Sequence, residues 1–171
     1  MMIKETMTSR QRVIKALNHE EADRIPIDLG GFQTGIHQRA YRDLIDYLGF
    51  EETLQILDPV QQLVIPSERV LEKFHVDFRY ITAHAPEGFR GDIQKSIRNG
   101  RLWHHLKDEF GVVWSMPDDQ KLYMDISYHP LASATLEDLA DYPFPKGNDP
   151  TRFTGVRERA LEMRRNTPYA L

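Results

Sequence analysis

The residues best suited to chemistry lie in the stretch from Asp28 to His37, directly after a short apolar segment. A carboxylate such as Asp28 can act as a general acid or base, and the side chains of Gln33 and His37 can hydrogen-bond a ligand. Gly30 and Gly31 let the backbone come close to a bound molecule or adopt a positive φ. The stretch therefore predicts a site in which Asp28 is catalytic and the other four residues contact the substrate.

The same residues also have ordinary structural interpretations. Two glycines after a strand are commonly turn residues, and their spacing matches neither G-x-G-x-x-G nor G-x-x-x-x-G-K-[ST], so no dinucleotide or P-loop site is predicted. A histidine in a loop, such as His37, is often simply solvated. Asp28 can equally cap the following helix or form a salt bridge with Arg24. These alternatives stay open at the level of the sequence.

Hydrophobic periodicity predicts the elements that must position these residues. Residues 24–29 alternate as a short strand, and residues 38–48 form a helix with the apolar positions Tyr41, Leu44, Ile45 and Leu48. A strand, a loop and a helix in this order are the first unit of an α/β fold, in which ligands bind beyond the carboxyl ends of the strands. A second strand is predicted over residues 76–81, and the loop after it contains His84.

The remaining chain alternates between helical and strand-like patterns. Further helices are predicted over residues 9–18, after Ser67, from Thr135 and from Pro150 to about Arg165, and residues 51–65 are interpreted as a short helix with an irregular connection. Residues 91–131 instead contain strand-like runs separated by turn signals. They predict an antiparallel insertion between α/β units, with a hairpin at Asn99-Gly100.

Some polar and aromatic residues are predicted to be structural. The adjacent His104 and His105 point to opposite faces of a strand, so joint binding of a metal is not expected. Asp77 is expected to pair with Arg79 or with a backbone amide. The aromatic side chains of the insertion are expected to pack within it: Trp103, Trp114 and Tyr123.

Composition excludes several classes of function. The chain is 40% apolar and 28% charged, with a net charge of -4 and a pI near 6.0, and its basic residues are mixed with acidic ones. Neither nucleic acid nor a membrane is therefore a predicted partner. The chain has no cysteine, which excludes disulfides, thiolate metal sites and a cysteine nucleophile. It also lacks a signal peptide and any apolar run of about 20 residues, so we expect a soluble cytoplasmic protein.

A set of short motifs covers nearly the whole chain in a fixed order: residues 8–17, 23–27, 74–78, 108–114, 129–131 and 136–145. Together they resemble the uroporphyrinogen decarboxylase superfamily, which includes the decarboxylase of haem synthesis and the corrinoid-dependent methyltransferases. The resemblance implies a (β/α)8 TIM-type barrel, which typically takes about 250 residues. The 171 residues would form its amino-terminal half. The end of the chain, where Tyr169-Ala-Leu171 starts like a new strand, favours the same interpretation of a cut barrel.

The resemblance also distinguishes the branches of the superfamily. In the decarboxylase, the loop after the first strand resembles Met-Arg-Gln-Ala-Gly-Arg-Tyr, and its arginines hold the substrate carboxylates. The matching residues 29–35 here contain no cation. Ala83 and His84 stand where the decarboxylase has the serine and catalytic aspartate of a Phe-Ser-Asp-Ile motif, so the resemblance implies that His84 is a catalytic residue. Because burying a polycarboxylate without cations is costly, the methyltransferase branch is favoured.

The methyltransferase branch implies a corrinoid (cobalamin) partner protein and a zinc ion held by His and Cys residues in the second half of the barrel. No metal ligand can be assigned to this chain. We expect a fragment of an enzyme that moves a methyl group between a small substrate or thiol and a corrinoid protein, inactive by itself. Two alternatives stay open: uroporphyrinogen decarboxylase, and a non-catalytic binding or assembly subunit. In either a fragment or a subunit, the open strand edge near Leu171 favours a homo-oligomer.

Overall fold

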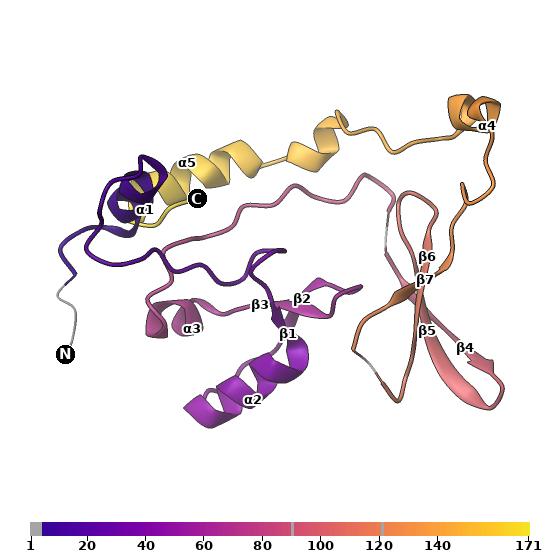
Figure 1. Ribbon diagram of the computed structural model, residues 1–171, viewed down its shortest axis with the longest axis horizontal. Coiled ribbons are helices and arrows are strands. Elements are labelled where there is room, and N and C mark those ends of the chain that lie inside the picture. Colours follow the sequence, from indigo (N-terminus) through magenta and orange to yellow (C-terminus); the bar gives the residue numbers. More distant parts are fainter. Residues whose placement is uncertain (1–4, 90, 121) are drawn as a thin grey trace. The chain divides into compact units, whose positions relative to one another are not determined.

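The computed structural model describes residues 5–89, 91–120 and 122–171, which form a mixed α/β fold (Figure 1). The chain divides into two units. The first unit contains the residues up to 57 together with 63–83 and 155–171, and the second contains 58–62 and 84–154. Each unit has its own cluster of buried apolar side chains.

The helices begin where the sequence provides capping side chains. The first unit contains α1 (Ser9–Leu17), α2 (Gln38–Leu48), α3 (Glu68–Lys73) and α5 (Val156–Asn166), and the second contains α4 (Leu136–Asp141) and the 3-10 helix η1 (Pro150–Phe153). Thr8 and Gln11 form the predicted capping box of α1, and the Ser67 hydroxyl accepts a hydrogen bond from the N–H of Val70 at 3.3 Å. The helices predicted to begin at these two caps are confirmed.

One predicted helix is interrupted. A single helix was expected from Pro150 to about Arg165, but η1 ends at Phe153 and α5 begins only at Val156. Between them Gly155 has a φ of 70°. A left-handed residue cannot continue a right-handed helix, so the two segments are separate elements.

Residues 51–65 contain two short strands, which corrects the predicted short helix. β2 (Gln55–Asp58) and β3 (Leu63–Ile65) belong to a three-stranded sheet of order β1-β3-β2, in which β1 (Ile36–His37) pairs antiparallel with β3. The Asp58 carboxylate accepts the N–H of Val60 at 2.8 Å, and Gln62 has a φ of 57°. These turn contacts reverse the chain and place Val64 in the core, where it is fully buried.

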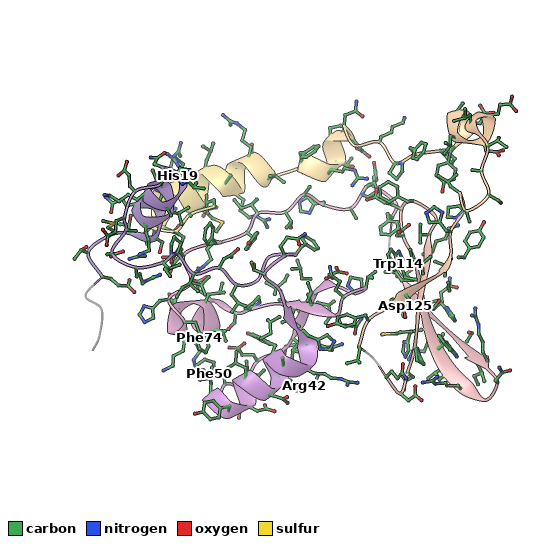
Figure 2. The ribbon with its side chains drawn as sticks, in the orientation of Figure 1. His19, Arg42, Phe50, Phe74, Trp114 and Asp125 are labelled. Atoms are coloured by element: carbon green, nitrogen blue, oxygen red, sulfur yellow. The ribbon has the colours of Figure 1, made fainter. Side chains whose placement is uncertain are left out.

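The core of the first unit lies between α2 and the three-stranded sheet. Its fully buried members are Tyr41, Ile45, Val64 and Val70. The Tyr41 hydroxyl donates to Glu52 and accepts the N–H of Ser67, both at 2.9 Å, so this polar group is satisfied inside the core. At the end of α2, the guanidinium of Arg69 stacks over the Phe50 ring at 3.5 Å (Figure 2 labels Phe50).

The segments predicted as the first two barrel strands are extended but form no regular ladder. The N–H of Asp77 donates to the carbonyl of Ile27 at 2.8 Å, while the N–H of Ile27 donates to the Asp77 carboxylate instead of a carbonyl. Pro26 has no N–H to offer. On the other side, Phe78 forms an isolated parallel bridge with Ala170. Three extended segments therefore lie side by side, and the described residues form no closed barrel.

The second unit contains the predicted antiparallel insertion. Its sheet has the order β4-β5-β6-β7, with β4 (Ile93–Arg98), β5 (Arg101–Lys107), β6 (Val113–Pro117) and β7 (Asp125–Tyr128) (Figure 1). Trp114 on β6, labelled with Asp125 in Figure 2, packs with Leu106, Met116 and Met124 on one face. Val60 from the other part of this unit covers the same cluster.

The Asn99-Gly100 hairpin is confirmed and provides a test of the fold. Asn99 and Gly100 have φ values of 51° and 73°, as a type I′ turn requires. We expect Gly100→Ala to lower the free energy of unfolding by about 1 kcal/mol, because an L-residue is strained at this φ. Urea unfolding followed by circular dichroism measures the change.

Gly147→Ala is the matched control for that substitution. A Cβ at either position meets no atom within 4 Å, and only Gly100 has a positive φ. Equal effects of the two substitutions would show that the left-handed backbone is not the source of the cost.

Candidate functional site

The Asp28 carboxylate is held by two hydroxyl groups from other parts of the first unit. The Tyr80 hydroxyl and the Thr34 hydroxyl both donate to Asp28 Oδ2, the latter at 3.1 Å. The other oxygen, Asp28 Oδ1, is buried and has no hydrogen-bond partner among the described residues. An unpaired buried oxygen costs free energy, so Oδ1 is an acceptor available to a donor group of a ligand or to water.

The two glycines allow this cluster to form. A Cβ on Gly31 would lie 2.4 Å from the Tyr80 ring, and Gly30 has a φ of 105°. The N–H of Gly30 donates to the carbonyl of Thr34 at 3.1 Å, and the N–H of Gly31 donates to the Thr34 hydroxyl at 3.3 Å. The glycines are thus required for a tight turn against Tyr80, and their predicted contact with a substrate stays a prediction.

A cavity of about 190 Å³ adjoins the cluster, with Leu29, Gly30, Pro66 and Tyr80 among its lining residues. Burial raises the pKa of Tyr80, and the hydrogen bond to Asp28 raises it further. The Tyr80 phenol is therefore protonated at neutral pH and remains a hydrogen-bond donor.

The structure brings together only part of the predicted site. Asp28, Gly30 and Gly31 lie in the cluster, whereas the Gln33 side chain is exposed. His37 is the N-cap of α2, where its Nδ1 accepts the N–H of Arg39 at 3.1 Å. Asp28 therefore does not cap α2, and it does not bind Arg24, which pairs with Asp77.

His84 belongs to the second unit. Its backbone N–H donates to the carbonyl of Arg152 at 2.8 Å, and its Nε2 lies 3.1 Å from the carbonyl oxygen of Thr154. The described contacts of His84 thus bind two segments of the second unit to each other. A role in catalysis stays a prediction.

Sequence reasoning missed Tyr80 and Thr34. The signal for Tyr80 was its position, because a polar aromatic residue at the carboxyl end of the predicted strand 76–81 lies where α/β folds bind ligands. Thr34 lies within the stretch from Asp28 to His37. Its hydroxyl contacts were not visible because they depend on the turn at Gly30 and Gly31.

A buried ionic network holds the two segments that carry Asp28 and Tyr80. The Asp77 side chain is fully buried, and its carboxylate lies 2.6 Å from both Arg12 Nη1 and Arg24 Nη1. Arg12 is also fully buried and binds Asp23 at 2.6 Å. The structural role predicted for Asp77 and its bond to a backbone amide are confirmed. Of the two alternative partners predicted for Asp77, the structure shows the backbone amide, which is that of Ile27, while Arg79 binds Glu68.

The network predicts a loss of stability in acid. Hydrogen bonding by Arg12 holds the pKa of Asp23 below its usual value. Burial would raise the pKa of Asp77, but hydrogen bonds led by that from Arg24 outweigh it and lower the pKa. Because an unfolded aspartate has a pKa of about 3.9, unfolding takes up protons near that pH. The stabilisation is complete above about pH 5 and is lost as the pH falls toward the folded pKa values.

Urea midpoints measured between pH 7 and pH 3 test this expectation. The midpoint should fall steeply below about pH 5 in the native chain and less steeply in Asp77→Asn, which lacks one of the two carboxylates. Identical slopes would mean that protonation of Asp77 is not coupled to unfolding.

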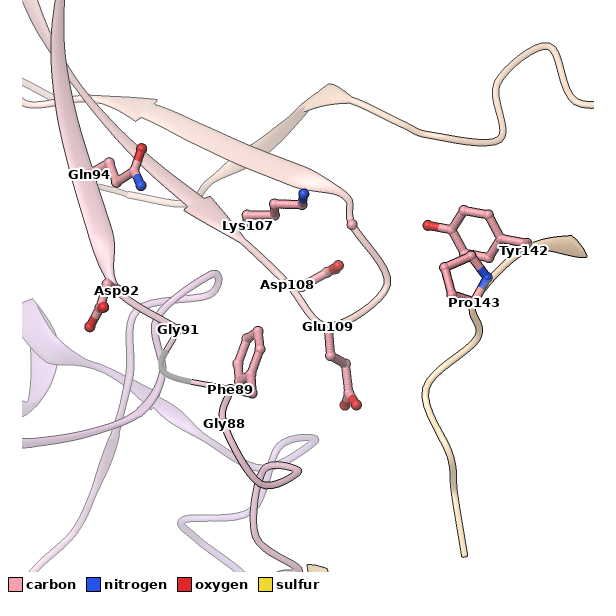
Figure 3. A pocket seen from close by; sticks show the side chains of 11 residues that line it. Gly88, Phe89, Gly91, Asp92, Gln94, Lys107, Asp108, Glu109, Tyr142 and Pro143 are labelled. Carbon is pink, nitrogen blue, oxygen red and sulfur yellow. The ribbon is translucent and has the colours of Figure 1, made fainter. Parts of the chain in front are cut away.

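The second unit has a larger cavity of about 500 Å³, lined by Asp92, Lys107, Asp108 and Glu109 among others (Figure 3). Two of its acidic groups, Asp108 and Glu109, already have partners. Asp108 accepts the N–H groups of Phe110 and Val112 at 2.9 and 3.0 Å and the Trp114 indole N–H at 2.8 Å. Glu109 forms an ion pair with Arg152. These carboxylates stabilise the loop after β5, which is a structural role.

The described residues contain no group of three or more His, Cys, Asp or Glu side chains that could hold a metal ion. His104 Nε2 lies 2.6 Å from Asp118, while His105 faces the other side of the sheet between two serines. The two adjacent histidines lie on opposite faces of the sheet, as predicted.

Comparison of the chain with protein-family models, with curated proteins and with solved structures finds no match. Within residues 5–89, 91–120 and 122–171, no helix is both long and apolar enough to cross a membrane. The family resemblance therefore rests on the sequence motifs, and the Asp28 cluster has to be interpreted from its own geometry.

Proposed function

We propose that this chain is the amino-terminal part of a uroporphyrinogen-decarboxylase-like barrel enzyme, of the corrinoid-dependent methyltransferase branch. The enzyme would move a methyl group between a small substrate or thiol and a corrinoid protein. One observation carries the proposal: the hydrogen bond between Asp28 and Tyr80, which lie at the ends of two adjacent extended segments. Side chains at the carboxyl ends of neighbouring strands form the site of a β/α barrel.

The chemistry of this cluster supports the choice of branch. The partners of Asp28 Oδ2 are both neutral hydroxyls, and no described arginine or lysine forms a salt bridge with Asp28. A carboxylate with a vacant acceptor oxygen attracts a substrate O–H, N–H or S–H group and repels a polycarboxylate. Uroporphyrinogen therefore fits this cluster poorly, while a small alcohol, amine or thiol fits it.

Asp28 would bind such a substrate and take up its proton. Oδ1 accepts the hydrogen bond of the substrate, and Tyr80 and Thr34 fix the orientation of the carboxylate through Oδ2. A thiol that loses its proton to Asp28 becomes a stronger nucleophile for a methyl group. A bound corrinoid would supply or take up that methyl group.

The residues described here do not fit the zinc site that the branch implies. The chain has no cysteine, and its described part has no suitable group of ligands. We derive no step through zinc for this chain.

A methyl-transfer assay tests the proposal. The protein from the whole reading frame that contains this chain is incubated with methylcobalamin and a small thiol, and cobalamin demethylation is followed by absorbance. We expect demethylation that depends on the protein, and no decarboxylation of uroporphyrinogen. Decarboxylation without demethylation would establish the alternative branch, and neither activity would refute both.

A further inference from the structure

Four polar side chains form a series of hydrogen bonds across one face of the sheet in the second unit. Ser96 Oγ on β4 lies 2.7 Å from His105 Nε2, and His105 Nδ1 lies 2.7 Å from Ser115 Oγ on β6. Ser115 Oγ lies 2.6 Å from Ser127 Oγ on β7. The series of hydrogen bonds ends at the carbonyl of Val113, to which the Ser127 hydroxyl donates at 3.1 Å.

The carbonyl at the end of this series of hydrogen bonds determines the direction of every proton in the series. A carbonyl only accepts, so when Ser127 donates its single proton to Val113, Ser115 donates to Ser127. Ser115 can then only accept from the Nδ1–H of His105. Burial lowers the pKa of His105, as do the charges of Arg98 and His104, so the ring is neutral at pH 7. Its Nε2 is therefore unprotonated and accepts the hydroxyl proton of Ser96.

We propose that Ser96 is a base-activated nucleophile, with His105 as its general base and Ser115 as a positioning residue, and that it accepts an acyl group from a small ester. A serine bonded to the bare nitrogen of a histidine whose other nitrogen is oriented by a third group is the arrangement of nucleophilic serine catalysis. This site is separate from the Asp28 cluster, which lies in the first unit.

The acyl transfer balances without any other reactant. Ser96 Oγ attacks the ester carbonyl carbon while its proton passes to His105 Nε2. The bond from that carbon to the leaving oxygen then breaks, and the proton returns from Nε2 to the leaving group. Ser115 is neutral and does not stabilise the imidazolium as an aspartate would. We therefore expect one slow acylation of each chain instead of rapid turnover.

The neighbours of Ser96 indicate the class of ester. Trp103 lies directly opposite Ser96 in the β4–β5 pair, and Arg98 follows two residues later on the same face. The Arg98 guanidinium lies 6.0 Å from the centroid of the Trp103 ring. An aromatic wall beside a cation suits an aryl ester whose carbonyl oxygen gains negative charge during attack.

Other charged groups also face His105 and will influence its titration. Arg98, Arg101 and Lys107 lie on its face of β4 and β5, Asp125 lies opposite Ser115 on β7, and His104 lies on the reverse face of β5. Because the shift of the His105 pKa is downward from 6.5, acylation should reach its plateau by about neutral pH.

The experiment uses p-nitrophenyl acetate and the purified chain. We expect a burst of one p-nitrophenolate per chain, an acetyl group on the Ser96 peptide by mass spectrometry, and no burst from Ser96→Ala. His105→Gln should slow acetylation about 100-fold, because general-base assistance is worth 10²–10⁴. Ser133→Ala, at an exposed turn serine, should leave the burst unchanged.

One further variant tests whether Ser115 orients His105 in a protein that still folds. Ser127 is exposed, so Ser127→Ala should fold normally, yet it frees the proton of Ser115 to point at His105 and should slow acetylation of Ser96. Acetyl groups on lysines alone, or Ser96 acetylation that is as fast in His105→Gln as in the native chain, would overturn the proposal.

Discussion

Replacing Asp77 with asparagine should lower the free energy of unfolding by about 3–5 kcal/mol, because Arg12 and Arg24 lose the buried anion that they share. Arg12 is fully buried and Arg24 is largely so, and both contact the Asp77 carboxylate at 2.6 Å. Removing one partner of a buried ion pair costs more than the pair itself contributes, since the remaining charge keeps its desolvation penalty. Urea unfolding at pH 7 measures the loss.

Asp119→Asn is the matched control. Asp119 also binds an arginine at 2.6 Å, but its side chain is 63% exposed and that of its partner Arg101 is 40% exposed. Water and salt screen this pair, so its loss should change stability only slightly. Similar losses for the two aspartates would show that burial does not govern the energetics of the network.

Asp28→Asn should reduce kcat/KM for methyl transfer by about 10²–10⁴-fold, because an amide cannot take up the substrate proton. The variant keeps the shape of Asp28 and can still accept the hydroxyls of Tyr80 and Thr34 through its carbonyl oxygen. The loss should therefore appear in kcat more than in KM, and circular dichroism should be unchanged. Methylcobalamin demethylation by the protein from the whole reading frame is the measurement.

Two further variants show whether a loss of activity is specific to the Asp28 carboxylate. Asp43→Asn changes an exposed aspartate of α2 and should leave the rate unchanged. Tyr80→Phe removes one of the two hydroxyls that orient Asp28 and should give a smaller loss than Asp28→Asn. If Asp28→Asn kept full activity, Asp28 would not be the base, although the family assignment could still stand through the demethylation assay. The acetylation of Ser96 does not depend on either outcome.

Several features were predictable because a few neighbouring residues decide them. The capping box of Thr8 and Gln11, the cap at Ser67 and the type I′ turn at Asn99-Gly100 all depend on side chains within four positions of one another. The four strands of the insertion follow from alternation and turn residues, which are equally local. These elements were therefore placed correctly from sequence patterns.

The predictions that were wrong have physical explanations. Residues 51–65 have enough apolar positions for a helix, but the turn made by Asp58 and Gln62 returns the chain so that Val64 packs in the core. Periodicity cannot distinguish short buried strands from helical turns. The helix expected from Pro150 was divided because Gly155 adopts a left-handed φ, which a glycine permits but does not require.

The sequence alone determined many of the local elements, and it made Asp28 a candidate for the site. Only the tertiary structure decided which residues pair over long separations. Tyr80 is 52 positions from its partner Asp28, and Arg12 is 65 positions from its partner Asp77. Contacts at such separations depend on how extended segments align, and no pattern within a window of residues encodes that alignment. The contacts from which we infer the tautomer of His105 likewise need four strands that meet on one face of a sheet.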